Sequence, residues 1–449
     1  MATRSWTGGA VTLKDTKTVT IANTWANDTD SATITINGKD LVVSIGTDDS
    51  SAQVATAIKE AFNGDAQTGT GDHTSSPAFT DGGGQAIPEF TEMVATVSGS
   101  VVTLTATDNA AGKPITVTET VTTAGSGTAV IATTINGTGP NDMNNADNWS
   151  GDTLPVDGDT VIFDSGDVDA LWNLQALAIQ PVAFTRTASY TGKIGLSEMN
   201  TDNSGQAYDE YRTTYWTWAN DGGTSATTVT LEGGGGRTKI DFADAGNITV
   251  NGTGKGTRNE FDVPEILLKG TDSDTIINVQ RGDVGAAFYA GEAFTLASLK
   301  MGWISSRALD AQVFLGTGCT TSSMAVTKAG GELEINTAFA SITQTAGETT
   351  VNGTGAISGV QKIYGGVYRI NTTGTVSGVI TAGGSGEVTF DGDPRTKTVS
   401  NPIEKHGDRS IIRDHQKAVT SLVVDCNESE ASDNIELGTD ARLTRAATA

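Results

Sequence analysis

Short runs of alternating apolar and polar residues recur along the whole chain and predict a protein built mainly from β-strands. Three such runs lie early in the sequence, at 19–21, 32–36 and 40–45, and their period of two matches the alternation of side chains between the two faces of a strand. Asn37-Gly38 separates the second run from the third, and Asn-Gly is a strong hairpin signal. This region therefore predicts an antiparallel sheet.

One segment of the same region has helical periodicity instead. Its apolar residues share one face, and they are Val54, Ala57, Ile58, Ala61 and Phe62. A residue within 49–51 is the expected N-cap, and Gly64 is the expected C-terminal stop. Further strands are predicted at 93–97, 101–105 and 115–121. We therefore expect a small α+β module over residues 1–135, with one helix near 51–63 lying across an antiparallel sheet.

The order of these elements resembles a module that is found repeatedly in the virion proteins of tailed phages. The segments that carry the resemblance are Ala32–Asp40, Ser51–Ile58 and Ala95–Ala106. Short β-motifs of this composition also occur in bacterial surface proteins. The resemblance implies a structural role in a virion or on a surface, and it implies no catalytic chemistry.

The C-terminal half contains a repeated pattern of Gly, three residues, an aliphatic or aromatic residue, and Asn or Asp. The pattern begins at Gly236, Gly246, Gly331, Gly347, Gly366 and Gly386. The last four repeats begin 16, 19 and 20 residues apart. Such near-constant spacing is typical of a β-solenoid, in which each repeat stacks a strand on the preceding one. An ordinary β-sandwich with chance recurrence of glycine is the alternative interpretation.

The apolar residue of each of these last four repeats predicts a ladder inside the solenoid. The four residues are Ile335, Val351, Ile370 and Phe390. One repeat is unable to bury its apolar side chain alone, so the four are expected to point inward and stack. Each fully buried residue of the ladder would stabilise the fold by roughly 1.5–3 kcal/mol.

The domain boundaries follow from changes in composition. The turn-rich stretch 136–164 predicts a linker and the first strand of a new domain, and its segments Asn148–Gly151 and Gly158–Val161 resemble the opening segment of β-helical adhesins. The β-solenoid-like body is expected over 165–393. After it, charge increases and glycine becomes rarer, which predicts a C-terminal cap and tail over 394–449 that closes the open end or docks on another subunit.

The charge of the chain argues against several partners. It has 28 Lys and Arg against 53 Asp and Glu, which gives a formal net charge of −25. The negative electrostatic field of such a chain repels nucleic acid and anionic membranes. No window approaches 18 consecutive apolar residues, and the first residues lack the apolar core of a signal peptide. We therefore expect synthesis in the cytoplasm without membrane insertion. Cys319 and Cys426 match no metal or redox spacing.

No residue set predicts catalysis or a cofactor. The histidines His73, His406 and His415 match neither a metal spacing nor a catalytic triad. Sugar-cleaving enzymes use pairs of carboxylates, and the candidate pairs here are Asp241 with Asp244 and Asp391 with Asp393. We expect these pairs to be turn residues in contact with solvent, because close carboxylates are frequent in so acidic a chain.

Four turn carboxylates are the candidates for an adventitious or structural Ca²⁺ ion. They are Asp142, Asp147, Asp157 and Asp159. Their spacing matches neither an EF-hand nor a calcium-binding nonapeptide repeat. A solvated turn is the expected state of these side chains, and no bound metal is predicted.

Four aromatic residues lie close together in the sequence and are candidates for an interface. They are Tyr211, Tyr215, Trp216 and Trp218. Tyr and Trp are enriched at subunit interfaces and can stack on sugars. Core packing at a domain junction is the alternative for the same residues.

Together these features predict a non-enzymatic structural protein of a virion, of the capsid-decoration or fibre type. It is expected to assemble with itself, with a trimer as first guess, because exposed solenoid ends need partners. Capsid or tail subunits are further expected partners, and a host surface glycan is a candidate ligand. A bacterial surface adhesin is the alternative function, and a glycan-degrading tail spike is a second alternative.

Overall fold

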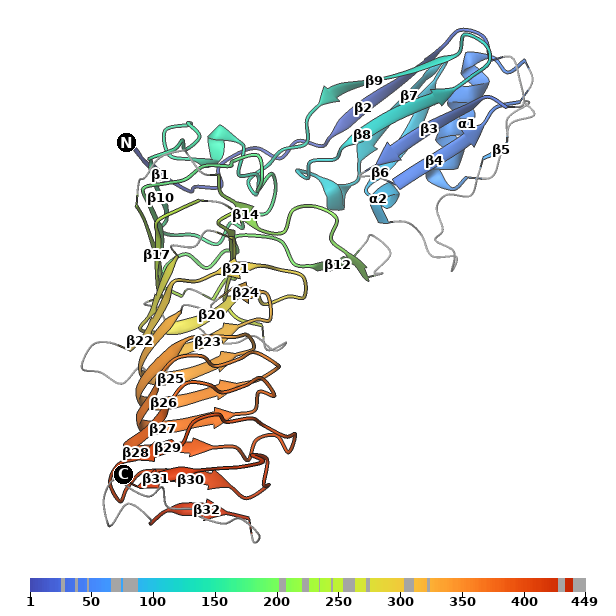
Figure 1. Cartoon of the computed structure of the whole chain (residues 1–449). Coiled ribbons are helices and arrows are strands. Elements are labelled where there is room, and N and C mark those ends of the chain that lie inside the picture. Colours follow the sequence, from blue (N-terminus) through green and yellow to red (C-terminus); the bar gives the residue numbers. More distant parts are fainter. Residues whose placement is uncertain are drawn as a thin grey trace.

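Figure 1 shows the computed structural model of the chain, in which a module with a helix lies beside one end of a tall stack of strands. The structure describes residues 1–25, 29–36, 39–46, 48–65, 74–75, 88–201, 207–219, 226–233, 235–243, 245–252, 263–271, 275–302, 311–320, 324–426 and 433–438. Strands account for 48% of it and helices for 6%, which confirms the prediction of a mainly β protein.

Two separate hydrophobic cores divide the described part of the chain. The smaller core, with members from Val19 to Ala129, belongs to the module. The larger core has members from Trp6 to Val424 and belongs to the stack. The N-terminal segment therefore packs into the stack, although the sequence predicted that the module begins at residue 1.

The module consists of two four-stranded antiparallel sheets and one long helix. The sheets have the orders β6-β7-β2-β9 and β5-β4-β3-β8. The elements are β2 Thr16–Ala22, β3 Ser31–Ile36, β4 Lys39–Ser44, α1 Ser51–Asn63, β5 Thr74–Ser75, α2 Pro88–Thr91, β6 Met93–Ser98, β7 Val101–Ala106, β8 Val117–Thr122 and β9 Thr128–Ile135, with a 3₁₀ turn at Asp108–Ala110. Strands β3 and β4 pair antiparallel, and the Asn37-Gly38 turn expected between them lies outside the described residues.

Helix α1 has well-defined ends. Ser50 is its N-cap: its side chain accepts from the Gln53 amide, and the Gln53 side chain accepts from the Ser50 amide, which is a capping box. Gly64 ends the helix with φ of 67°, a left-handed conformation that costs glycine little. All five apolar residues predicted to share its inner face are buried. The helix is therefore fixed locally by its caps and globally by its apolar face.

The stack is one sheet that joins twenty strands of the described chain. Its strands are β1 Thr3–Ser5, β10 Thr160–Phe163, β11 Ala183–Arg186, β14 Trp216–Thr217, β15 Thr227–Leu231, β16 Thr238–Asp241, β17 Ile248–Gly252, β18 Ile266–Lys269, β19 Ile276–Val279, β20 Gly282–Ala286, β22 Ser298–Met301, β23 Ala311–Leu315, β25 Ala325–Ile335, β26 Ser341–Val351, β27 Gln361–Ile370, β28 Ile380–Thr389, β29 Ile403–Lys405, β30 Ile411–Asp414, β31 Val424–Cys426 and β32 Ile435–Leu437. Every pairing between these strands is parallel.

Two interleaved series of strands merge halfway along the stack. One series runs β15–β17–β19–β22 and the other β14–β16–β18–β20–β23. Both end on β25, whose first half pairs with β22 and whose second half pairs with β23. Each long strand from β25 to β28 therefore contains two sides of a repeat, joined by a bend.

The glycines of the predicted repeat form this bend. Gly331, Gly347 and Gly366 have φ of 73°, 83° and 73°. A Cβ on Gly347 would lie 2.3 Å from the carbonyl oxygen of Gly331, and one on Gly366 would lie 2.0 Å from that of Gly347. Glycine is thus required at these positions for two reasons: the backbone is left-handed, and neighbouring repeats approach closely. At the fourth repeat, Gly384 rather than Gly386 takes the positive φ, 56°.

The asparagines that end the repeats beginning at Gly347 and Gly366 are also stacked. The Asn352 side-chain amide donates to Glu334 at 3.0 Å, and that of Asn371 donates to the Asn352 side-chain oxygen at 3.0 Å. A further side of the repeats is linked by isolated parallel bridges that join Phe339, Ile357, Val376 and Val399 in turn. The repeats thus stack on several sides.

The N-terminal end of the stack is built from segments far apart in sequence. Strand β1 pairs with β10, and Trp6 packs on Trp149 and Phe163 with ring centroids 5.2 and 5.5 Å away. Trp149 follows a 3₁₀ turn at Ala146–Asn148. The side chain of the buried Asn148 donates to Gly139 and Asp142 carbonyls and accepts from the Ala10 amide. The predicted linker is therefore part of a packed end.

The region predicted as a C-terminal cap continues the stack instead. Strands β29 to β32 pair parallel with β28 and with one another, and Ile403, Ile412 and Val424 belong to the same hydrophobic core. Part of the higher charge that suggested a cap lies on outward positions such as Arg413, which pairs with Glu387 and Glu436 at 2.6 Å. Other charged side chains of this region, Lys397, Lys405 and Asp414, are buried and form hydrogen bonds with the backbone. Residues 439–449 lie outside the described residues.

Two small pairs of strands complete the described structure. Strands β12 Met199–Thr201 and β13 Ala207–Asp209 form an antiparallel pair, and β21 Phe294–Thr295 pairs parallel with β24 Cys319–Thr320. The β12–β13 pair extends from the stack on the side where the module lies (Figure 1).

Candidate functional site: the junction between module and stack

The chain passes between the stack and the module twice, and the two passages are bonded together. Leu13 and Thr138 form an antiparallel bridge, with amide-to-carbonyl distances of 2.7 and 3.2 Å. Gly137 passes so close to the module that a Cβ there would lie 2.4 Å from the Lys113 carbonyl oxygen. The module is therefore an insertion held by paired connections.

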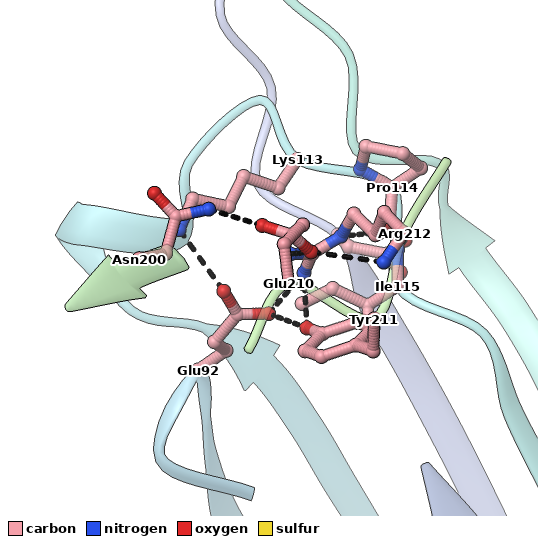
Figure 2. Close-up of polar contacts among 9 residues, drawn as sticks. Glu92, Lys113, Pro114, Ile115, Asn200, Glu210, Tyr211 and Arg212 are labelled. Atoms are coloured by element: carbon pink, nitrogen blue, oxygen red, sulfur yellow. Dashed lines mark hydrogen bonds and ion pairs between the residues drawn. The ribbon is translucent and has the colours of Figure 1, made fainter. Parts of the chain in front are cut away.

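A network of charged side chains forms a second connection, shown in Figure 2. Its centre is Glu92 of the module, which pairs with Lys113 of the module at 2.9 Å. From the stack, Arg212 forms an ion pair with Glu92, and the Tyr211 hydroxyl donates to the same carboxylate. Arg212 also donates to the Pro114 carbonyl oxygen at 3.3 Å. We call Glu92, Lys113, Tyr211 and Arg212 the clasp.

Neighbouring side chains hold Arg212 in place. Its guanidinium pairs with Glu210 at 3.2 Å, and Glu210 in turn accepts from Asn200 of strand β12. The guanidinium carbon lies 4.2 Å from the ring centroid of Tyr211 and 5.4 Å from that of Trp172. Cation–π contacts of this kind are worth about 0.5–1 kcal/mol at exposed sites and about 2 kcal/mol when they are desolvated. The β12–β13 pair and Trp172 therefore position the arginine toward the module.

The clasp is largely hidden from water. The side chains of Glu92 and Arg212 are 6% and 10% exposed. Burial alone would raise the pKa of Glu92, but the charges of Arg212 and Lys113 outweigh burial and hold that pKa below its usual value. Burial, together with the Glu92 carboxylate, raises the pKa of Tyr211 well above its usual value, so its hydroxyl remains a donor. At neutral pH the clasp is an ionised, hydrogen-bonded unit.

The aromatic residues proposed as an interface are not on the surface, with one exception. Tyr215, Trp216 and Trp218 are 2%, 0% and 1% exposed. Trp216 and Trp218 pack edge to face at 5.4 Å, and both contact Phe184 in the core of the stack. The interface prediction is wrong for these three, because their side chains fill the interior. Tyr211 alone lies at an interface, the one between module and stack.

The predicted ladder residues are brought together. Ile335 and Val351 are direct partners in neighbouring strands, as are Val351 and Ile370. Phe390 follows directly after β28, whose Thr389 is the partner of Arg369, and all four ladder residues are 0% exposed. The same column continues toward the N-terminus through Leu315, Ala286, Leu268, Ile240 and Trp216.

The carboxylates considered for catalysis have other roles. Asp391 accepts from His415 at 2.7 Å, and Asp393 pairs with Arg395. Asp241 pairs with Lys269 at 3.3 Å, and Asp244 lies outside the described residues, as does His73. His406 lies 3.8 Å from Glu404. None of these contacts brings a nucleophile together with a general base.

The calcium candidates are largely engaged by the chain itself. Asp142 accepts from Thr138, Asn144 and Asn173, Asp157 accepts from the Gln180 amide, and Asp159 accepts from the Ala2 amide. They cap backbone amides at turns. Asp147 donates its own amide to Asn145. No cluster of three or more potential metal-ligating side chains occurs in the described part of the chain.

The sequence patterns did not predict the clasp or the burial of several lysines. Two of these lysines, Lys239 and Lys328, are each 1% exposed. The Lys328 ammonium donates to the carbonyls of Gly331 and Ala346, and burial lowers its pKa to about 7. Alternation was a usable signal for Lys328, because Val326, two residues earlier, points inward. Arg212, which pairs with Glu92 from the stack, lies 120 residues away in the sequence, and no local pattern indicates that contact.

Comparison with known proteins gives no relative: no family model, no curated protein and no solved structure matches this chain. Within the described residues, no helix is long and apolar enough to cross a membrane. The function must therefore be argued from the geometry itself.

Proposed function

We propose that this chain is a non-enzymatic structural protein of a virion, of the capsid-decoration or fibre type. In this proposal it assembles in several copies, with a trimer as first guess, and contacts capsid or tail subunits. The stack projects as a stiff body, and the protein presents an adhesive surface to the host.

The observation that carries the proposal is the combination of one continuous stack with a module fixed to its side. A single core runs along the stack, with buried members from Trp6 to Val424. Neighbouring strands are paired along the stack, with register shifts at the bends between β25 and β26 and between β27 and β28, so bending the stack would break many contacts together. The clasp then fixes the module against this body. A stiff body that carries an oriented module is suited to spacing and presenting surfaces.

We further propose that the parallel sheet is a β-solenoid. Support comes from the in-register parallel pairing of successive repeats, from the bends at Gly331, Gly347 and Gly366, and from the bridges on a further side. Consecutive repeats contact mainly their neighbours, as in a quasi-one-dimensional fold. The sequence resemblance of the module to tailed-phage virion proteins supports the location in a particle.

The experiment that tests the proposal is quantitative mass spectrometry of purified particles from the source that encodes this chain. A virion component is present at a fixed number of copies per particle and remains after density-gradient purification and high-salt washing. Recovery of the chain in the cell-envelope fraction, with none in particles, would favour the bacterial adhesin. Cleavage of host capsule by the purified chain would favour the glycan-degrading spike.

A further inference from the structure

A pocket of about 660 Å³ opens on the side of the stack, next to the base of the β12–β13 pair. Its volume is within the range of small-molecule sites. Residues from four separate segments line it, among them Lys193, Glu198, Met199, Arg237, Glu265 and Tyr289. It is distinct from the clasp.

The pocket holds an excess of positive charge. Glu198 is neutralised by the buried Lys239, and Glu265 pairs with the fully buried Arg186 at 3.0 Å. Among the residues that the structure describes, no ion pair joins Arg237 or Lys193 to a carboxylate. In a chain of net charge −25, two cations without such partners in one pocket favour an anionic ligand.

The rest of the lining suits a ligand with hydroxyl groups and a ring. Tyr289 is half-buried, and burial and the Glu198 carboxylate raise its pKa above the usual value, so its hydroxyl stays protonated. Carboxylates such as Glu198 accept hydrogen bonds from hydroxyls. Met199 is 56% exposed and offers an apolar wall. Since Glu198 and Glu265 also line the pocket, a ligand with a single negative charge and several hydroxyls fits this lining better than a phosphate dianion does.

We propose that this pocket binds a carboxylate-bearing sugar unit of an acidic polysaccharide. Arg237 and Lys193 hold the sugar carboxylate, Glu198 accepts from ring hydroxyls, and Tyr289 packs against the ring. The inference rests on the proposed function, because it names the ligand class of the adhesive surface. Its test needs no particle, so a failure here is distinguishable from a failure of the virion assignment.

The test is isothermal titration calorimetry of the full chain with three acidic probes: trigalacturonate, a glucuronate-containing hyaluronan tetrasaccharide and sialyllactose. Each probe is paired with a neutral counterpart that lacks the carboxylate. We expect at least one acidic probe to bind about tenfold more tightly than its counterpart, since hydrogen bonds between charged groups are the stronger ones. The affinity should fall as sodium chloride is raised.

Two variants locate the site. Arg237→Gln should weaken binding of the acidic probe about tenfold or more, and Lys362→Gln, at an exposed position on strand β27, should leave it unchanged. Thermal unfolding of each variant checks that the fold is retained. Three results would overturn the inference. The first is that no acidic probe binds at a probe concentration of about 10 mM, which detects even very weak affinities. The others are equal binding of acidic and neutral probes, and unchanged binding in Arg237→Gln. Equal binding of inorganic phosphate and the sugar would overturn the sugar assignment.

Discussion

Replacement of Arg212 by alanine should release the module from its fixed position on the stack. Removing one partner of a buried ion pair typically costs 3–5 kcal/mol, because the other charge stays buried. Both side chains are largely buried here, at 6% and 10% exposure. Glu92 keeps its contact with Lys113 at 2.9 Å, which places the expected cost at the lower end, about 3 kcal/mol. The equilibrium constant for docking of the module on the stack should therefore fall about 100-fold.

Two measurements read this change. Hydrogen exchange of the β12–β13 pair should accelerate by the same factor of about 100, because the variant loses the Arg212 side chain that links this pair to the module. Double electron–electron resonance between spin labels at positions 52 and 375, where Ala52 and Thr375 are exposed, should show a narrow distance distribution in the parent and a broad one in the variant. Cys426 is replaced by serine for labelling, and burial raises the pKa of Cys319 to about 12, which keeps it unreactive.

The matched control is Arg369→Ala. Arg369 pairs with Glu348 at 3.1 Å, but the two side chains are 33% and 46% exposed. Exposed pairs contribute about 1 kcal/mol or less, so exchange should change less than about fivefold. If Arg212→Ala behaves like this control and its distance distribution stays narrow, the clasp does not hold the module, and the reasoning from burial is refuted.

Three further outcomes follow from the stack. Ile370→Ala should lower the free energy of unfolding by about 2–5 kcal/mol, as measured by urea titration, whereas Thr381→Ala on the outer face should change it by less than about 0.5 kcal/mol; equal effects would contradict the ladder. Gly347→Ala should cost more than about 2 kcal/mol, because a Cβ would lie 2.3 Å from a carbonyl oxygen, and Gly99→Ala, with open space around it, should cost only about 1 kcal/mol; thermal unfolding separates the two. Burial lowers the pKa of Lys328 to about 7 in the folded protein. Between pH 7 and the usual pKa of lysine, the Lys328 amine is therefore protonated in the unfolded chain and largely neutral in the folded protein. The free energy of unfolding should therefore rise with pH from 7 to 9, with a slope for this group that approaches about 1.4 kcal/mol per pH unit once the pH is above 8. Lys328→Met should remove that contribution, and parallel pH profiles for parent and variant would contradict the burial of the amine.

Local sequence signals were sufficient for the elements that local physics determines. The N-cap and Gly64 define helix α1, and the repeated glycines mark the bends because no other residue tolerates both their φ and their close contacts. The ladder residues could be predicted because alternation and repeat spacing both point them inward. These features depend on residues within one repeat or one turn.

Other features depend on contacts between distant segments and left no local pattern. The paired residues of strands β1 and β10 are 157 residues apart in the sequence, as for Thr3 and Thr160, so the start of the chain looked like part of the module. The buried Tyr215, Trp216 and Trp218 looked like an interface because sequence alone does not show which face of a short strand packs inward. The charged residues after residue 394 looked like a cap, although apolar residues of the same region continue the core of the stack and Lys397 and Lys405 are buried. The clasp joins Glu92 to Arg212 in the same nonlocal way.

The most direct test of the central proposal is cryo-electron microscopy of the native assembly that contains this chain, at side-chain resolution. The proposal predicts the chain in ordered, symmetric contact with a capsid or tail lattice, with several copies related by symmetry and the module held at one angle by the clasp. Isolated copies on a cell envelope, or the absence of the chain from every particle, would contradict it.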